Sequence, residues 1–208
     1  VQSSRVYLEP DQTAPSVELY PFENAVCTGV LAYAFCGTDN GGAGLPEYFQ
    51  AHVRTPGGSV VASSGWFDYA APTGALNRVQ ASWNLASLAA GDYLLEVAVR
   101  DPAGNGAVSA RQAFAIDRTP PAFTVALAGG ASSWQQHAAP VTVTLAAPEP
   151  GDWLLQLSND GVQWSEPLRC TGTVVTVREW TLVQGRIEAS YTATVYARVT
   201  DGAGLSAT

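Results

Sequence analysis

An internal repeat of about 100 residues constrains the fold of this chain more than any other feature of its sequence. Residues 94–104 (LLEVAVRDPAG) match residues 194–204 (TVYARVTDGAG). In each copy a strand with alternating inward residues runs into an Asp-x-Ala-Gly turn. Such an Asp caps local backbone N–H groups, and such a Gly tolerates a positive φ. The repeat therefore predicts two similar units, each with a half-buried strand that ends in a tight turn.

A second pair of matching segments marks the joints between units. Asp11-Gln-Thr-Ala-Pro15 matches Asp117-Arg-Thr-Pro-Pro121, and the stretches just before them, 6–9 and 114–117, are also alike. Proline removes a backbone donor and fixes φ, so strand pairing stops at these points. Each joint is therefore expected to be a short, stiff linker between two strand-rich units.

The joints set the predicted domain boundaries. One complete unit spans residues 12–118 and a second spans 119–208, while residues 1–11 are expected to be the terminal strand of a preceding unit. The second unit lacks a counterpart of the strand at 108–117, which follows the turn in the first unit. The chain is thus expected to start with a spare terminal strand and to end without one.

The composition favours strands and excludes several kinds of partner. Of the 208 residues 47% are hydrophobic and 13% are charged, with 20 Gly and 13 Pro, which suits short strands joined by turns. The net charge of −8 argues against nucleic acid or an anionic membrane as a partner, because both need a basic face. No stretch reaches about 18 consecutive apolar residues, so no membrane insertion is expected. The absence of Met suggests a processed product or a piece of a longer protein.

Short alternating runs bounded by turn residues predict an all-β chain. A tight hairpin is expected at Asn159-Asp-Gly161, and about seven strands per unit fit a two-sheet Greek-key sandwich. The strands expected in the first unit are 16–20, 25–36, 47–54, 58–64, 79–85, 92–100 and 107–116, and those in the second are 122–128, 139–146, 152–158, 162–168, 173–182 and 191–200.

Several short motifs carry a family resemblance. Leu88, Gly91 and Tyr93 look like the tyrosine corner of Greek-key sandwiches, in which the Tyr hydroxyl bonds upstream backbone. Together with the Asp-x-Ala-Gly turns and the Ser158-x-Asp-Gly-x-x-Trp164 segment, they give a chain that resembles tandem bacterial Ig-like (immunoglobulin/fibronectin-III-like) domains of secreted or cell-surface proteins. Residues 185–191 depart from the pattern, because they are longer than the equivalent stretch of the first unit.

The resemblance implies two tandem Ig-like Greek-key β-sandwiches, the second lacking its final strand, on the surface of a bacterium or outside it. It implies spacing, adhesion or display, with other units of the same array or neighbouring subunits as partners and a cell-surface or glycan ligand as a further one. It does not fix the ligand.

Catalysis is not expected. His52 and His137 are the only histidines, one in each unit, and no nucleophile-elbow motif accompanies them.

Calcium is the cofactor that the sequence favours most, because oxygen ligands from loops suit a hard cation. The candidate ligands are Asp39, Asp101, Asn105 and Asp117, and the alternative is that these side chains cap turns.

The remaining candidates are aromatic residues and cysteines. Trp66, Phe67 and Tyr69 could form a sugar-stacking platform, but adjacent strand residues point to opposite faces, so core packing of one and edge coverage by another is favoured. Four tryptophans on strand patterns are expected to lie mainly in the core: Trp83, Trp153, Trp164 and Trp180.

Two of the three cysteines, Cys27 and Cys36, either form a disulfide across a chain reversal near Gly29 or are two small buried hydrophobic residues. Cys170 has no neighbouring Cys or His that would suggest a metal site.

Three functions follow as hypotheses. The leading one is a non-enzymatic stalk or adhesin segment built from Ig-like units. The second is a filament subunit in which Val6, Tyr7 and Leu8 of one chain add a strand to the second unit of a neighbour; its alternative is a longer array cut out of phase with its domains. The third is a carbohydrate-binding accessory module, which rests on the Trp66 cluster.

Overall fold

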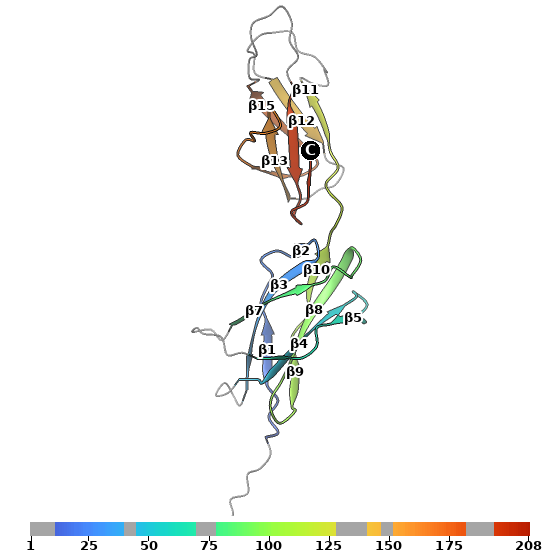
Figure 1. Cartoon of the computed structure of the whole chain (residues 1–208), viewed down its shortest axis with the longest axis vertical. Coiled ribbons are helices and arrows are strands. Elements are labelled where there is room, and N and C mark those ends of the chain that lie inside the picture. Colours follow the sequence, from blue (N-terminus) through green and yellow to red (C-terminus); the bar gives the residue numbers. More distant parts are fainter. Residues whose placement is uncertain (1–10, 40–44, 70–77, 128–140, 147–151, 182–193) are drawn as a thin grey trace, which may run out of the picture. The chain divides into compact units, whose positions relative to one another are not determined.

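The structure is a computed structural model that describes residues 11–39, 45–69, 78–127, 141–146, 152–181 and 194–208. The chain divides into two compact units, 1–117 and 118–208. Strands form all the regular structure of the described residues, arranged as two sheets in each unit (Figure 1). The predicted all-β class is therefore confirmed.

Unit 1 is a sandwich of a three-stranded sheet, β1-β3-β7, and a larger sheet, β2-β10-β8-β4-β5. Two short strands extend the larger sheet, since β6 pairs with β4 and β9 pairs with β8. The strand order is that of an Ig or fibronectin-III-like Greek key. The strands are β1 (Ser16–Leu19), β2 (Val26–Cys27), β3 (Val30–Thr38), β4 (Tyr48–Arg54), β5 (Val60–Ser63), β6 (Phe67–Asp68), β7 (Arg78–Asn84), β8 (Gly91–Arg100), β9 (Gly106–Val108) and β10 (Gln112–Ile116).

The core of unit 1 lies between these two sheets. The Phe35 ring is fully buried and lies 4.9 Å from the ring centroid of Phe49 and 5.9 Å from that of Tyr69. From the opposite sheet, β8 adds Leu95 and Val97, which are both fully buried. Burying such side chains stabilises the fold by roughly 1.5–3 kcal/mol each. The alternation in β8 that the sequence predicts is therefore what closes the core.

The predicted single strand 25–36 is in fact two strands that belong to different sheets. Gly29 has a φ of 148°, and the chain crosses there from β2 to β3. Strand β2 then runs parallel to β10, with Val26 opposite Ala115. As a result Cys27 packs toward the core from the larger sheet, whereas Cys36 pairs with β1 and β7 in the smaller one. Both thiols are free, so the disulfide alternative is not supported.

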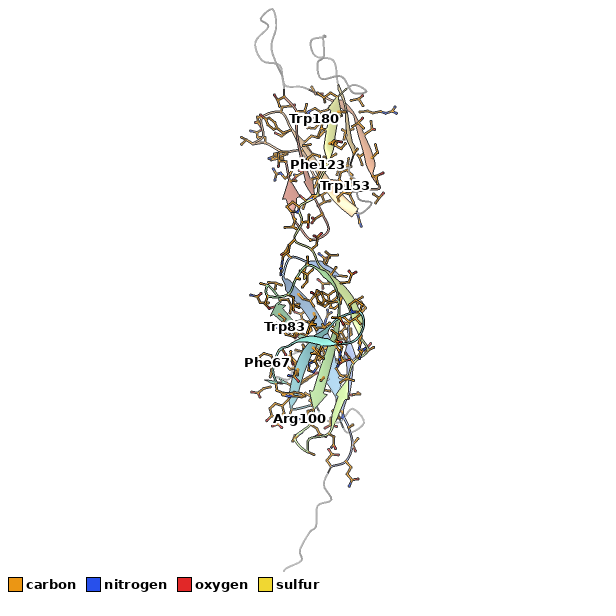
Figure 2. The ribbon with its side chains drawn as sticks, turned by 90° about the vertical axis from the view of Figure 1, so that its right-hand side faces the viewer. Phe67, Trp83, Arg100, Phe123, Trp153 and Trp180 are labelled. Carbon is orange, nitrogen blue, oxygen red and sulfur yellow. The ribbon has the colours of Figure 1, made fainter. Side chains whose placement is uncertain are left out.

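Unit 2 repeats the same sheet order, with β11-β12-β15 in one sheet and β14-β13-β16-β17 in the other. Its core contains Trp153, Leu155 and Val199, with Phe123 and Trp180 packed against them (Figure 2). The strands are β11 (Thr124–Leu127), β12 (Val141–Ala146), β13 (Asp152–Ser158), β14 (Leu168–Thr171), β15 (Val174–Trp180), β16 (Tyr196–Thr200) and β17 (Ser206–Ala207).

The hairpin predicted between 152–158 and 162–168 is wrong. The Asp160 carboxylate accepts the N–H groups of Val162 and Gln163, both at 2.8 Å, which holds the turn in a capped, non-strand conformation. Strand β13 instead pairs with β14, which begins at Leu168. Trp164 consequently lies outside the core, with the Arg198 guanidinium 3.9 Å from its ring centroid.

Unit 2 has a counterpart of β9 but none of β10 among the described residues. Strand β17 pairs with Val199 and Thr200 of β16, just as β9 pairs with the end of β8. In unit 1, β10 continues this edge and contributes Phe114 and Ile116 to the core. Among its described residues, unit 2 therefore has the two-sheet arrangement of unit 1 and no counterpart of β10.

The two Asp-x-Ala-Gly turns have the same backbone bond to the Asp side chain but differ in the residue that follows the Gly, Asn105 in unit 1 and Leu205 in unit 2. In each turn the Asp Oδ1 atom accepts the backbone N–H four residues on, at 2.8 Å for Asn105 and 2.9 Å for Leu205. The Asn105 side chain also donates to Asp101 Oδ2 at 2.8 Å. Leucine cannot make that bond, and the Oδ2 atom of Asp201 is buried without a hydrogen-bond partner among the described residues. An unsatisfied buried acceptor destabilises a fold.

A reciprocal exchange tests this difference. We expect Leu205→Asn to stabilise unit 2 by about 1 kcal/mol, because it supplies the missing donor, and Asn105→Leu to destabilise unit 1 by about 1–3 kcal/mol. The measurement is denaturant unfolding followed by NMR, which reports each unit separately. Leu205→Ala is the control for lost leucine packing. If the Asn and Ala variants at position 205 are equally stable, the Asp201 Oδ2 atom is not an unsatisfied acceptor that the new side chain can bond.

Candidate functional site

Three carboxylates converge at one end of unit 1. Asp11 precedes β1, Asp39 follows β3 and Asp101 follows β8, and their ligand oxygens all lie within 4.8 Å of one another. Asp39 and Asp101 are buried, with 4% and 1% of their surface exposed, while Asp11 is exposed. Two like charges at about 5 Å repel by roughly 3 kcal/mol at an effective dielectric constant of 20. This acidic cluster therefore needs compensation from donors or from a cation.

Asn105 supplies part of that compensation. Its side-chain Nδ2 donates to Asp101 Oδ2 at 2.8 Å and to the Asp11 carbonyl oxygen at 3.0 Å. Burial alone would raise the pKa of Asp101, but hydrogen bonds from Asn105, Gly104 and Ala103 outweigh it and hold the pKa below its usual value. Asp101 is thus kept ionised. Three carboxylates from separate loops form a donor set of the kind that Ca²⁺ prefers.

The structure brings together most of the predicted calcium ligands but not all. Asp39, Asp101 and Asn105 meet at this end, whereas Asp117 follows β10 at the opposite end of β8, where its N–H donates to the Cys27 carbonyl. Asp11 was not among the predicted ligands. The repeat could have pointed to Asp11, because Asp11 occupies the same position of the joint motif as Asp117, which was a predicted ligand.

The predicted aromatic platform separates into three environments. Tyr69 is buried, and its hydroxyl accepts the Gly37 N–H at 2.7 Å. Phe67 stacks on Phe49 with ring centroids 5.4 Å apart. Trp66 lies on the outer face of the larger sheet, with the Arg100 guanidinium 4.8 Å from its centroid. The three residues therefore do not form one continuous stacking surface.

The predicted tyrosine-corner residues hold the turn that leads into β8. The Tyr93 hydroxyl donates to the Ala89 carbonyl at 3.0 Å, which is the upstream backbone contact expected at such a corner. Gly91 has a φ of 148°, and Leu88 packs against the core. Strand β8 therefore starts from a fixed turn.

The outer face of the larger sheet also carries an ion network. Glu96 accepts from Arg54 Nη2 at 2.7 Å and from Arg111 Nε at 2.9 Å. Burial would raise the pKa of Glu96, but the hydrogen bonds and charges of the two arginines outweigh it and lower the pKa. Glu96 makes no hydrogen bond to His52 among the described residues, so it does not orient that ring as a base. The network crosslinks β4, β8 and the chain before β10.

His52 lies beside a hydroxyl but not in a catalytic arrangement. Its Nδ1 atom is 3.1 Å from Ser63 Oγ, and the same hydroxyl accepts from Gln50 Nε2 at 2.9 Å. Burial lowers the pKa of His52, which keeps the ring neutral at pH 7. No acid of the described residues holds the other ring nitrogen in the way that a triad requires. The group is a hydrogen-bonded surface ladder between β4 and β5.

Some predicted residues lie outside the described residues. The strand-donor candidates Val6, Tyr7 and Leu8 belong to this set, as does His137. Among the described residues, no helix is long and apolar enough to cross a bilayer.

Comparisons with known proteins add little to this picture. No protein-family model matches the chain, and a search of curated proteins gives no match. Among solved structures, the chain is similar to the fibronectin(III)-like modules of CbhA from Clostridium thermocellum, at 12% identity over 93% of this chain and 90% of that chain, with a TM-score of 0.47. A similarity at this level carries no argument, so the fold assignment rests on the strand order described above.

Calcium binding at the acidic cluster has a direct test. We expect Ca²⁺ to raise the melting temperature of unit 1 in the wild-type chain, since a ligand at 100 times its Kd stabilises the native state by about 2.7 kcal/mol. Asp39→Asn should abolish this increase and should not lower stability in calcium-free buffer, because it removes one of three repelling charges. Differential scanning calorimetry with and without Ca²⁺ gives both values.

Asp92→Asn is the matched control, because Asp92 is an exposed carboxylate at the other end of β8. It should leave the calcium response unchanged. A wild-type chain whose melting temperature ignores Ca²⁺, or an Asp39→Asn variant that responds as the wild type does, would show that the cluster only caps turns.

Proposed function

We propose that this chain is a non-enzymatic structural or adhesion segment of an extracellular array of Ig-like units, secreted by a bacterium or displayed on its surface. The observation that carries the proposal is the parallel pairing of a strand near the start of unit 1, β2, with its last strand, β10. The chain enters unit 1 through β1 and then forms β2, and it leaves through β10, which runs parallel to β2. This arrangement suits a module that transmits tension.

The geometry of β2 and β10 explains why. Ala115 N–H donates to the Ala25 carbonyl at 2.8 Å, and Asp117 N–H donates to the Cys27 carbonyl at 2.9 Å. When parallel neighbours are pulled from opposite ends, their hydrogen bonds are loaded together in shear and cannot open one after another. We call this pair of bonded segments the β2–β10 clamp.

A second set of contacts ties the incoming chain to the strands that close the sandwich. Gln112 Nε2 donates to the Leu19 carbonyl at 2.7 Å, and Asn105 Nδ2 donates to the Asp11 carbonyl at 3.0 Å. Each bond links the start of unit 1 to its last strands, because the bonded residues are 93 and 94 positions apart in the sequence. Tension on the incoming chain therefore meets resistance before β1 can detach from β3.

The polar groups of the described residues also support a structural role. The buried carboxylates of Glu96 and Asp101 are held by arginines and by turn donors, and the Ser63–His52 pair lies in a sheet ladder. Each of these groups is explained by what it does for the fold. None is poised toward a substrate position.

The clamp can be weakened by one substitution. We expect Ala115→Pro to lower the force at which unit 1 unfolds by a larger fraction than its free energy of unfolding, because it removes the bond to Ala25 while the alternating bonds from β10 to β8 remain. The loss of equilibrium stability from one such bond is about 0.5–1.5 kcal/mol. Single-molecule pulling and denaturant unfolding give the two values.

Ala113→Pro is the matched control. Its N–H is on the same side of β10 as that of Ala115 but lies beyond β2, which pairs only with Ala115 and Ile116. If the two proline variants unfold at the same force, the clamp does not carry the load and the mechanical proposal fails.

A second candidate function is a filament subunit. One observation favours it. In unit 1, β10 pairs with five residues of β8, whereas the corresponding strand of unit 2, β16, is paired on that edge at only two of the described residues, by β17. In this hypothesis residues 1–11 of one chain pair with unit 2 of a neighbour in the position that β10 has in unit 1. Light scattering coupled to gel filtration tests it. Concentration-dependent oligomers that vanish when residues 1–10 are deleted would support the filament, and a monomer at all concentrations would exclude it for this chain.

A further inference from the structure

An open apolar hollow lies on the outer face of the larger sheet of unit 1. It has a volume of about 290 Å³. Trp66 and Val108 line it with 43% and 61% of their surface exposed, and Ala98 and Gly106 are the smaller lining residues. On this face Ala98 is the cross-strand partner of Val108, and Arg100 is the partner of Gly106. Small residues between two large ones leave room there for a ligand.

Among the described residues, Arg100 is the one charged residue that lines the hollow, and its guanidinium has no carboxylate partner there. Its guanidinium lies 4.8 Å from the Trp66 centroid and 5.5 Å from the Tyr48 centroid (Figure 2 labels Arg100). The ion pairs of the described residues use Arg54 and Arg111 instead. A guanidinium held between two rings is preorganised, so little side-chain entropy is lost when an anion binds it.

The carboxylates nearby do not neutralise Arg100. Glu47 and Asp68 act on the Tyr48 hydroxyl, where hydrogen bonding and charge from Glu47 raise the pKa most. Glu47 is bonded to Arg100 only through the backbone, where its N–H donates to the Arg100 carbonyl oxygen at 2.9 Å, and no ion pair of the described residues joins either carboxylate to the Arg100 guanidinium. The hollow therefore combines an apolar lining with one unpaired, bidentate-capable cation.

The shape of the hollow selects a compact ligand. Its lining comes from Trp66 and from two short adjacent stretches, 98–100 and 106–108, so it fits one ring better than an extended chain. A pyranose has an apolar C–H face that packs on aromatic and aliphatic side chains. The unpaired guanidinium favours a ring that carries a carboxylate over a neutral one.

We propose that this hollow binds an acidic sugar, namely a hexuronic acid unit of a polysaccharide. The ring packs between Trp66 and Val108, and its carboxylate pairs with Arg100. The proposal is independent of the mechanical function, since neither Trp66 nor Arg100 takes part in the β2–β10 clamp. It adds a ligand of stated chemistry to the outer face of unit 1.

The test is an NMR titration of the full 208-residue chain with trigalacturonate, with the neutral trigalactoside and a short acidic peptide as comparison ligands. We expect trigalacturonate to shift resonances of 98–100 and 106–108 and to bind at least ten times more tightly than the neutral sugar. Raising the salt concentration should weaken this binding, because the contact with Arg100 is ionic.

Three variants identify the residues responsible. Arg100→Gln and Trp66→Ala should each weaken binding about tenfold or more, and Arg100→Lys should bind more weakly than the wild type because it loses the bidentate geometry. Trp164→Ala is the matched control, because Trp164 also packs under an arginine, Arg198, but in unit 2. It should bind as the wild type does.

Four results would overturn the proposal. They are no binding of trigalacturonate by the folded wild-type chain, equal binding of the neutral sugar, tighter binding of the acidic peptide, or an Arg100→Gln variant that retains full affinity. The dispersion of the amide resonances shows in the same spectra whether each variant is folded.

Discussion

The alternation of side chains along β8 is the constraint on which the rest of unit 1 depends. Leu95, Val97 and Val99 point inward and are buried, so the residues between them must face outward. Glu96 is thereby presented to its two arginines, and Arg100 to the aromatic rings of the outer face. A shift of one residue would turn the Glu96 carboxylate into the core, away from its two arginines, and would expose the core side chains, so the register is strongly fixed. The strand then ends at Asp101, which places a carboxylate in the acidic cluster.

Much of the fold could be predicted from the sequence because the signals were local. The alternation of β8 and the Asp-x-Ala-Gly turns depend on neighbouring residues, and the structure has them where the repeat places them. The break at Gly29 and the absence of a strand at 162–168 could not be predicted in the same way. The first depends on which sheet accepts β2, and the second on side-chain caps from Asp160 that compete with strand pairing.

The candidate sites were harder to predict, because they join loops that are distant in sequence. Loop carboxylates at Asp39 and Asp101 could be named as ligands from their type and position. That Asp11 joins them, and that Asp117 does not, depends on which end of the sandwich each loop reaches. The hollow beside Trp66 depends on the small side chains of two paired strands. Alternation along β8 places Ala98 on the same face as Arg100, but no spacing in the sequence shows that Gly106 and Val108 of β9 join them there.

We propose that unit 1 resists tension between its two ends through the β2–β10 clamp. The most direct test is single-molecule pulling of the wild-type chain by its termini. We expect unit 1 to unfold at a clearly higher force than unit 2, whose described residues show no parallel pair equivalent to β2 and β10. If unit 1 unfolds at the same force as unit 2, or at a lower one, the claim is contradicted.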